Sequence, residues 1–448
     1  MNGFNLSDIT DAKLGATTLG SIYLGSTKLW PLGTDYSKEY LTIESLADNN
    51  TITWTFTGSD PIQNVIYWSK NGTSWASAIA SPSDTPVSLA TLNKGEKMYL
   101  KGENVTYALS ASAYSHFNSD YEFNVSGNIM SLIYGDNFIG QTTLSSAFNF
   151  VSIFTSSKVV DASNLILPAT TLADYCYSKM FRGCTSLTTT PELPATKLTS
   201  SCYSNMFRDC TSLTTAPELP ATILADSCYK SMFYGCTSLT AAPELPVTTL
   251  ADYCYLYMFY KCTSLATSPA LPATKLTSSC YAYMFEGCSS LITAPELPAT
   301  TLADGCYMSM FAGTKITAAP ELPATTLADS CYRNMFYGCS SLRYPPTLNA
   351  TILQPRCYQH MFFGCTSLKT APELPATTLV TYCYAYMFQN CTSLSYIKCL
   401  ATNISASNSH DWWLYNVAST GTFKKKASMT SWPANAHGIP RGWTVVNV

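Results

Sequence analysis

The sequence predicts an α+β protein built around a solenoid of nine 26-residue units, each with one short helix and one short strand. A Met-Phe pair recurs every 26 residues from Met180 to Met387, with one interval of 25 residues. Short runs of alternating apolar and polar residues precede these repeats, and a tryptophan-rich segment follows them. These observations divide the chain into an N-terminal segment (1–35), a small β-sandwich (36–130), an N-terminal cap of the solenoid (131–166), the solenoid (167–398) and a C-terminal aromatic cap (399–448).

The repeat reads L-P-A-T-T-L-A-D-x-C-Y-x-x-M-F-x-G-C-T-S-L-T-T-A-P-E, with one residue missing near Thr314. Its apolar positions follow the stripe expected of a short amphipathic helix, and Gly183 lies where such a helix ends. The segment 187–189 then predicts a brief strand, because Pro191 and Pro194 cannot donate to a sheet. A period of 26 residues lies in the range of leucine-rich repeats, whose units bury their apolar stripe by stacking on their neighbours.

The segment M-F-x-G-C-T-S-L, followed by an apolar-proline step, closely resembles the BspA-like class of leucine-rich repeats, which reads A-F-x-G-C-x-S-L-x-x-I-x-I-P. Here Met replaces the first Ala, and Ala-Pro-Glu-Leu-Pro replaces the Ile-x-Ile-Pro strand. The resemblance covers about half of the chain and implies a leucine-rich-repeat-type solenoid with a shortened sheet.

The flanks of the repeat predict different structures. Strands are expected at 40–43, 51–56, 65–68 and 98–100, and Asn71-Gly72 is a hairpin signal, so an Ig-like or other small β-sandwich is expected. Residues 145–166 look like a degenerate first unit that lacks the cysteines. After the last repeat, large aromatics are expected to cover the open end of the solenoid; these are Trp412, Trp413, Trp432 and Trp443.

The N-terminal motif I-Y-L-G-S-T-K-L-W-P looks like a segment at the start of many phage structural proteins. Together with the β module and the repeats, it resembles leucine-rich proteins encoded by phages and prophages of gut bacteria. The resemblance implies attachment to other virion proteins through Tyr23, Leu24, Leu29 and Trp30. The alternative is a hairpin that only caps the β module.

The N-terminus has no basic and apolar regions typical of a signal peptide, and no segment is long and apolar enough to cross a membrane. Synthesis in a cytoplasm and no membrane insertion are therefore expected. The resemblance to phage proteins implies that this is the cytoplasm of a phage host and that the protein is located in the virion. A formal charge of -3 gives no reason to expect nucleic acid.

Nothing in the sequence resembles a catalytic set or a cofactor fingerprint, so we expect no enzyme and no cofactor. The 18 cysteines lack zinc spacing and are expected to be buried thiols stacked in two ladders. A further ladder, separate from the two thiol ladders, is acidic and is either a solvated edge of the rod or a calcium site. It comprises Glu192, Glu218, Glu244, Glu296, Glu321 and Glu373.

The positions that vary most between copies are the two residues before Met-Phe and the one after it. In a stacked solenoid they align as a strip, and its aromatic members suit recognition of a host-surface glycan or protein. The candidate binding residues are Tyr234, Tyr257, Tyr260, Tyr283, Tyr337, Phe363 and Tyr386, with Arg182, Arg208, Arg333 and His360 as polar members. The alternative is that the tyrosines merely cover the surface.

Together these features predict a non-enzymatic phage virion protein of a tail, fibre or capsid, which presents its solenoid for adhesion to a host surface. By analogy with phage fibres it is a possible homo-trimer. Two alternatives remain: a bacterial cell-surface adhesin, and a purely architectural virion protein.

Overall fold

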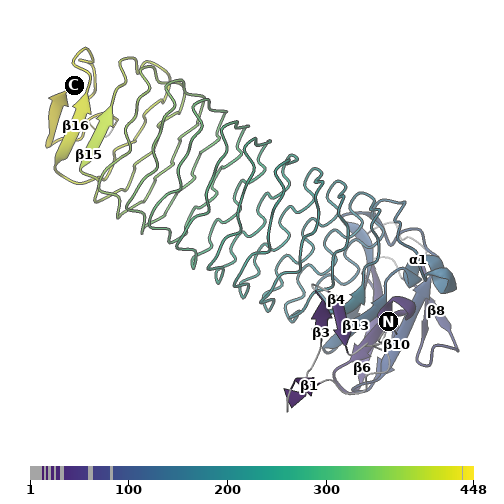
Figure 1. The fold of residues 1–448 in the computed structure, drawn as a ribbon. Coiled ribbons are helices and arrows are strands. Elements are labelled where there is room, and N and C mark those ends of the chain that lie inside the picture. The colour runs from purple at the N-terminus through teal and green to yellow at the C-terminus, as the bar shows by residue number, and fades with distance from the viewer. Residues whose placement is uncertain are drawn as a thin grey trace.

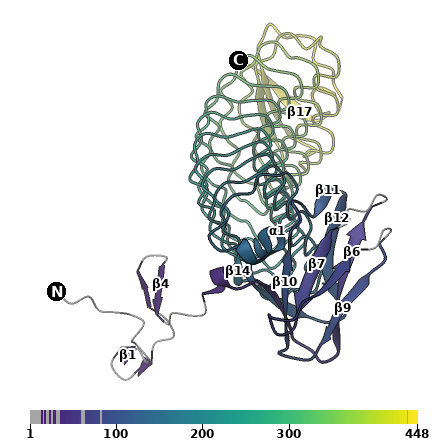
Figure 2. The same cartoon turned by 90° about the vertical axis from the view of Figure 1, so that its right-hand side faces the viewer.

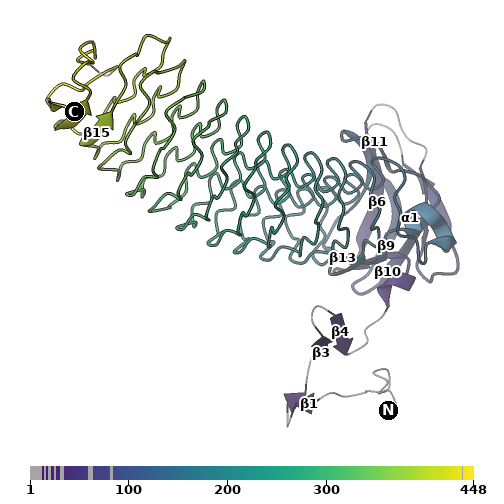
Figure 3. The ribbon, with the colours of Figure 1, turned by 45° about the horizontal axis from the view of Figure 1, so that its top comes forward.

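A computed structural model describes residues 35–58, 64–80, 84–435 and 437–448, together with the backbone of four short strands between residues 13 and 30. The stacked repeats form an elongated rod that begins at a β module and carries the C-terminus at its far end (Figures 1 and 3). In Figure 2 the rod is seen obliquely and foreshortened, as a coil.

The β module consists of two sheets. The six-stranded sheet has the order β14-β13-β5-β10-β7-β8, and its strands are β5 (Leu41–Ser45), β7 (Val65–Ser69), β8 (Ala76–Ile79), β10 (Lys97–Gly102), β13 (Phe123–Asn128) and β14 (Asn164–Ile166). The four-stranded sheet has the order β11-β12-β6-β9, and its strands are β6 (Asn50–Thr57), β9 (Val87–Leu92), β11 (Ala108–Ser110) and β12 (Ala113–Ser119). Buried side chains of both sheets belong to one hydrophobic cluster.

The strands predicted at 40–43, 51–56, 65–68 and 98–100 are confirmed as β5, β6, β7 and β10. The hairpin signal at Asn71-Gly72 lies in the turn between β7 and β8, which pair antiparallel. Gly72 has a φ of 73°, and the Asn71 side-chain oxygen accepts hydrogen bonds from the backbone N–H groups of Thr73 and Ser74. The short η2 (Tyr36–Lys38) precedes β5 in the chain, and α1 (Ser131–Tyr134) and η3 (Gly135–Asn137) lie between β13 and β14.

The β module continues directly into the solenoid. Strand β14 pairs parallel with β13, and the backbone N–H groups of Tyr107 and Phe117 donate to the carbonyls of Asn149 and Ile153. The rings of Tyr107 and Phe117 also pack on Phe150 and on Phe154, the first side chains of the aromatic ladders described below. The module therefore covers the N-terminal end of the rod.

The helix predicted in each unit is wrong. Where it was expected, the chain makes successive turns, and every fourth residue has a positive φ, as at Tyr175 (58°), Lys179 (59°) and Gly183 (75°). This period of four residues buries the same positions as the predicted helical stripe, so the apolar pattern was compatible with both structures. In an α-helix, four residues overshoot one turn of 3.6 residues, so a stripe with a strict period of four drifts around the helix.

The backbone hydrogen bonds of these turns alternate in direction. The N–H groups of Cys176 and Ser178 donate to carbonyls three residues earlier in the same unit, whereas those of Tyr175 and Tyr177 donate to carbonyls of the next unit. Half of the donors thus close turns and half connect neighbouring units along the rod, which satisfies a buried backbone without a helix or a continuous sheet.

The short strand expected at 187–189 is also wrong. In the repeats the extended segments form isolated parallel bridges, such as Asp161 with Thr189 and Ala318 with Tyr344. The prolines of each Ala-Pro-Glu-Leu-Pro segment carry no N–H group, so a ladder cannot extend through them.

Stacked side chains fill the interior of the rod. Tyrosines from Tyr177 to Tyr384 stack with ring centroids 5.7 to 6.1 Å apart. Phenylalanines from Phe181 to Phe388 stack at 5.5 to 5.9 Å. These separations exceed the roughly 4.8 Å between adjacent strands, so the nearly parallel rings are offset, as aromatic pairs prefer.

The expectation of buried thiols is confirmed, since all 18 cysteines are free and buried. In the second ladder the thiol donates to the carbonyl of the Phe in the preceding unit, as from Cys236 to Phe207 at 3.0 Å. Thr314 replaces this cysteine in the shortened unit, and its hydroxyl donates to Phe311 of its own unit.

The turn backbone extends one unit beyond the Met-Phe copies on each side, with positive φ at Phe148, Ser152 and Ser156 before them and at Asn408, Trp412 and Asn416 after them. The rod then ends in a parallel sheet of β15 (Tyr396–Cys399), β16 (Gly421–Lys425) and β17 (Trp443–Asn447). Trp413 stacks on Tyr384 and is covered by Trp432.

The positive φ angles predict a stability difference between neighbouring units. Ser279 has a φ of 48°, and the equivalent residue of the next unit is Gly305, with a φ of 61°. We expect Ser279→Gly to raise the free energy of unfolding by up to about 1 kcal/mol, because glycine adopts this conformation without a Cβ clash. Gly305→Ala is expected to lower it by about as much. Urea denaturation of both variants checks this, and shifts of the same sign in both would contradict it.

Candidate functional site

The strip predicted from the variable positions lies along the turns of the solenoid. The residue directly before Met-Phe has a positive φ, and like the residue after Met-Phe it reaches the surface in most copies. The other preceding residue was also expected at the surface, and this expectation is wrong in most units. Its side chain is buried at Ser178, Ser204, Leu256, Ala282, Gln359 and Ala385. The seven aromatic candidates all occupy the two exposed positions.

Four of these candidates form a first aromatic cluster. Tyr234 stacks on Tyr260 with centroids 4.6 Å apart, and Tyr257 stacks on Tyr283 at 4.5 Å. Tyr257 and Tyr260 meet edge to face at 5.6 Å, which joins the two pairs. The Arg208 guanidinium lies over the Tyr234 ring, 4.0 Å from its centroid, and extends the cluster by a cation–π contact.

Charged side chains surround this first cluster. Lys261 lies over the Tyr260 ring at 5.3 Å. Burial raises the pKa of Glu286, and the nearby Lys261 ammonium partly opposes this increase. Burial, the Tyr283 hydroxyl and the Glu286 charge together raise the pKa of Tyr257 to about 12, so its phenol stays protonated at neutral pH. A shallow hollow of about 360 Å³ adjoins these rings and is lined in part by Asn205 and Lys230.

The remaining candidates form a second aromatic cluster. Tyr337 stacks on Phe363 at 4.6 Å with nearly parallel rings, and His360 stacks on Tyr386 at 4.6 Å. His360 also packs against Phe363 at 5.8 Å. Burial and the neighbouring Arg333 lower the pKa of His360 to about 4, so the imidazole is neutral at physiological pH and stacks as an aromatic ring.

The two clusters are separated by the shortened unit. There the strip positions hold Ser309 and Ala312, whose side chains are buried. The Tyr283 hydroxyl contacts Met308 Sδ at 3.7 Å, and the stacked aromatics do not continue beyond it. The candidate residues of the strip therefore form two separate clusters in the structure.

Sequence reasoning missed Lys261, Glu286, Asn205 and Lys230. A signal for Lys261 was present, because its position holds glycine in most copies, and a cation there departs from the repeat. Glu286 occupies the variable position after Met-Phe, but only aromatic and basic residues were selected from that position.

The proposed attachment residues lie in a hairpin. Tyr23 and Leu24 belong to β3 (Ile22–Leu24), and Leu29 and Trp30 belong to β4 (Thr27–Trp30), which pairs antiparallel with β3. Two further short strands, β1 (Lys13–Leu14) and β2 (Thr17–Thr18), precede it. The rest of the 1–34 segment and all of its side chains lie outside the described residues, so attachment through these four residues stays a prediction.

The glutamates of the acidic ladder lie at the rod surface, where Lys398 pairs with Glu373 at 2.9 Å. Within the ranges that the structure describes, no three His, Cys, Asp or Glu side chains are grouped as metal ligands. No helix in the same ranges has the length and apolar character needed to cross a bilayer.

Comparison with known proteins identifies the repeat. The family model described as "BspA type Leucine rich repeat region" matches residues 154–292 and 306–436, in 6 copies, which together make up more than half of the chain. A search of curated proteins finds no match.

Proposed function

Because this chain belongs to the BspA type leucine-rich repeat family, we propose that it is a surface adhesin-type repeat protein without enzymatic activity. The proposed binding surface consists of the first cluster (Arg208, Tyr234, Tyr257, Tyr260 and Tyr283) and the second cluster (Tyr337, His360, Phe363 and Tyr386). The observation that carries the proposal is the pairwise stacking of these side chains from neighbouring units.

The geometry favours a protein ligand for this surface over a glycan. Sugars pack their C–H groups on free ring faces, but here the ring faces are turned toward one another along the rod. The edges, the phenol hydroxyls and the Arg208 guanidinium remain for contact. Tyr and Arg are the residue types that dominate the binding energy of protein interfaces, and stacked rings lose little side-chain entropy on binding.

Removal of the first cluster tests the proposal. We expect the triple variant Tyr257→Ala, Tyr260→Ala, Tyr283→Ala to weaken saturable binding of the labelled full chain to cell surfaces by about 30-fold or more, because hot-spot tyrosines contribute at least about 2 kcal/mol. Isolated bacterial envelopes are the target, and surface plasmon resonance gives the affinity.

The matched control changes Tyr253 and Tyr344, which are exposed tyrosines of the same rod that stack on no aromatic ring among the described residues. The control is expected to bind like the wild type. Protease treatment of the target should abolish binding and periodate treatment should not. Unchanged binding of the triple variant would contradict the proposal, and the reverse treatment pattern would identify a glycan ligand.

The virion role is a second candidate, and it rests on the sequence of residues 22–31. In that role the hairpin of Tyr23, Leu24, Leu29 and Trp30 attaches the chain to other virion proteins, and the rod is presented to a host surface or has a purely architectural role. Both the phage origin and the trimeric state stay predictions.

A further inference from the structure

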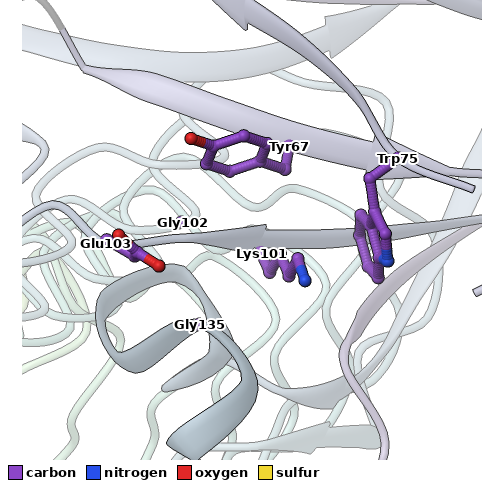
Figure 4. A pocket seen from close by; sticks show the side chains of 6 residues that line it. All are labelled: Tyr67, Trp75, Lys101, Gly102, Glu103 and Gly135. Carbon is purple, nitrogen blue, oxygen red and sulfur yellow. The ribbon is translucent and has the colours of Figure 1, made fainter. Parts of the chain in front are cut away.

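A second site lies on the β module, on the outer face of the six-stranded sheet. Tyr67 of β7 and Lys101 of β10 are cross-strand partners, and their side chains point away from the core that Ile66 and Leu100 fill. Together with Trp75, which precedes β8, they line a cavity of about 310 Å³ (Figure 4). Gly102, Glu103 and Gly135 complete its lining, and the cavity is open to solvent on one side.

The glycines shape one wall of the cavity. A Cβ on Gly102 would point into the core of the module, 2.3 Å from the buried Tyr107 hydroxyl and 2.7 Å from the Leu132 carbonyl oxygen, so the core excludes a side chain there and Gly102 lines the cavity with its backbone alone. Gly135 has a φ of 52°, and a Cβ there would lie 3.4 Å from the Glu103 side chain. The backbone is therefore bare at this wall, and Glu103 presents its carboxylate beside it (Figure 4).

The opposite wall is held in place by a polar network. The Lys101 ammonium lies 4.3 Å from the centroid of the Trp75 ring and donates to both Asp136 oxygens, at 2.7 and 2.9 Å. The Tyr40 hydroxyl donates to the same carboxylate at 2.7 Å, and the Tyr40 ring meets Trp75 edge to face at 5.1 Å. Trp75 and Lys101 are thus fixed before any ligand arrives.

The remaining binding capacity belongs to Tyr67 and Glu103. The Tyr67 ring lines the cavity and stacks on no aromatic ring among the described residues. In the same ranges the Glu103 carboxylate forms no ion pair. Asp136 already neutralises Lys101, so the cavity keeps one uncompensated negative charge, which disfavours anions.

We propose that this cavity binds one uncharged pyranose residue of a glycan, with the sugar C–H face on the Tyr67 ring, Trp75 as the side wall, and the sugar hydroxyls donating to Glu103. An aromatic wall with a few fixed polar groups is the usual construction of a small-molecule site, and the volume suits a ligand of one sugar ring. The site is separate from the stacked aromatics of the rod, and the inference does not rest on their role.

Saturation-transfer NMR of the full chain tests the site, with the methyl glycosides of glucose, galactose, mannose and N-acetylglucosamine as probes. We expect transfer to at least one of them. Glu103→Gln is expected to weaken its binding about tenfold, because a charge-assisted hydrogen bond is lost, and Trp75→Ala to abolish it. Glu103 is exposed, so its replacement tests the site without a change in the core.

Two controls make the result specific. Tyr121→Ala, an exposed tyrosine of the same module, and the Tyr257, Tyr260, Tyr283 triple variant should both bind the sugar like the wild type. The methyl glycoside of N-acetylneuraminic acid, which is anionic, should bind at least about tenfold more weakly than the best neutral probe. Absence of transfer to every neutral probe, full binding by Glu103→Gln, or equal binding of the anionic sugar would overturn the proposal.

Discussion

Above about pH 9 the rod is expected to lose stability steeply, because its buried thiols cannot ionise while it stays folded. Burial raises the pKa of Cys280 and Cys339 to about 11, and that of Cys184 and Cys391 to about 12, from an ordinary thiol value near 9. The unfolded chain therefore releases protons at a lower pH than the folded chain does.

This difference gives the direction of the effect. Since the folded pKa values are raised, the stabilising contribution is complete below about pH 8.5 and is lost as the pH rises from there toward 11 or 12. Each thiol that ionises only on unfolding contributes about 1.4 kcal/mol per pH unit. Two neighbouring units contain four such thiols, so their stability falls by roughly 5 kcal/mol per pH unit.

Thermal unfolding followed by circular dichroism between about pH 7 and pH 11 measures the effect. All samples contain the same concentration of a reductant, which prevents disulfide formation. A variant with Cys228, Cys254 and Cys280 replaced by Ala is the control. It will be less stable at neutral pH, because cavities form, but its stability should fall less steeply with pH. Equal slopes for the variant and the wild type would exclude the thiols as the cause.

Trp413→Ala is expected to destabilise the C-terminal end of the rod by about 3 to 5 kcal/mol. The Trp413 side chain is fully buried, stacks on Tyr384 at 6.3 Å and on Trp432 at 5.2 Å, and donates from its indole nitrogen to the Gly438 carbonyl at 3.0 Å. Its removal leaves the last tyrosine of the ladder open to water. Because each unit contacts mainly its neighbours, the loss is expected to be local.

Hydrogen exchange resolved along the sequence measures this loss. Protection should decrease in the units around Tyr384 and Tyr358 and remain unchanged around Tyr177. Trp412→Ala is the matched control, since Trp412 is 40% exposed and the change should alter stability by less than about 1 kcal/mol. A uniform loss of protection along the whole rod would show that the units unfold together and would refute a local capping role.

The sequence predicted the stacked repeat, its period and its buried positions, because the nine copies themselves distinguish packing positions from free ones. It did not predict the backbone. Cys176, Met180 and Cys184 are spaced by four residues, a spacing that resembles a helix over this short length. A partial signal was the set of Asn, Asp and Gly residues at the same spacing, as at Gly183, Asn205 and Asp209, which tolerate positive φ more readily than other residues.

The candidate site was predicted in part for a related reason. The aromatic residues at variable positions were identifiable from the alignment of the copies with one another. Their division into two groups was identifiable too, since Ser309 and Ala312 interrupt the aromatic residues in the unit that lacks one residue. The pairwise stacking of the rings within each group was not, because it depends on side-chain conformations. The cavity at Tyr67 and Trp75 lies outside the repeats, so no comparison between copies could reveal it. Its residues are distant in the sequence and are brought together by strand pairing in the β module.

The alternating hydrogen bonds of the turns determine how the rod responds to force. Bonds between units run along the rod axis, so tension applied at its two ends loads every interface between units. Units are expected to detach one after another from an end, where a unit has a stacked neighbour on one side only. Each unit that detaches releases 26 residues of chain, or about 85 to 90 Å when extended. Under load the rod therefore lengthens in steps of one unit, while the undisturbed units keep their stacked cores.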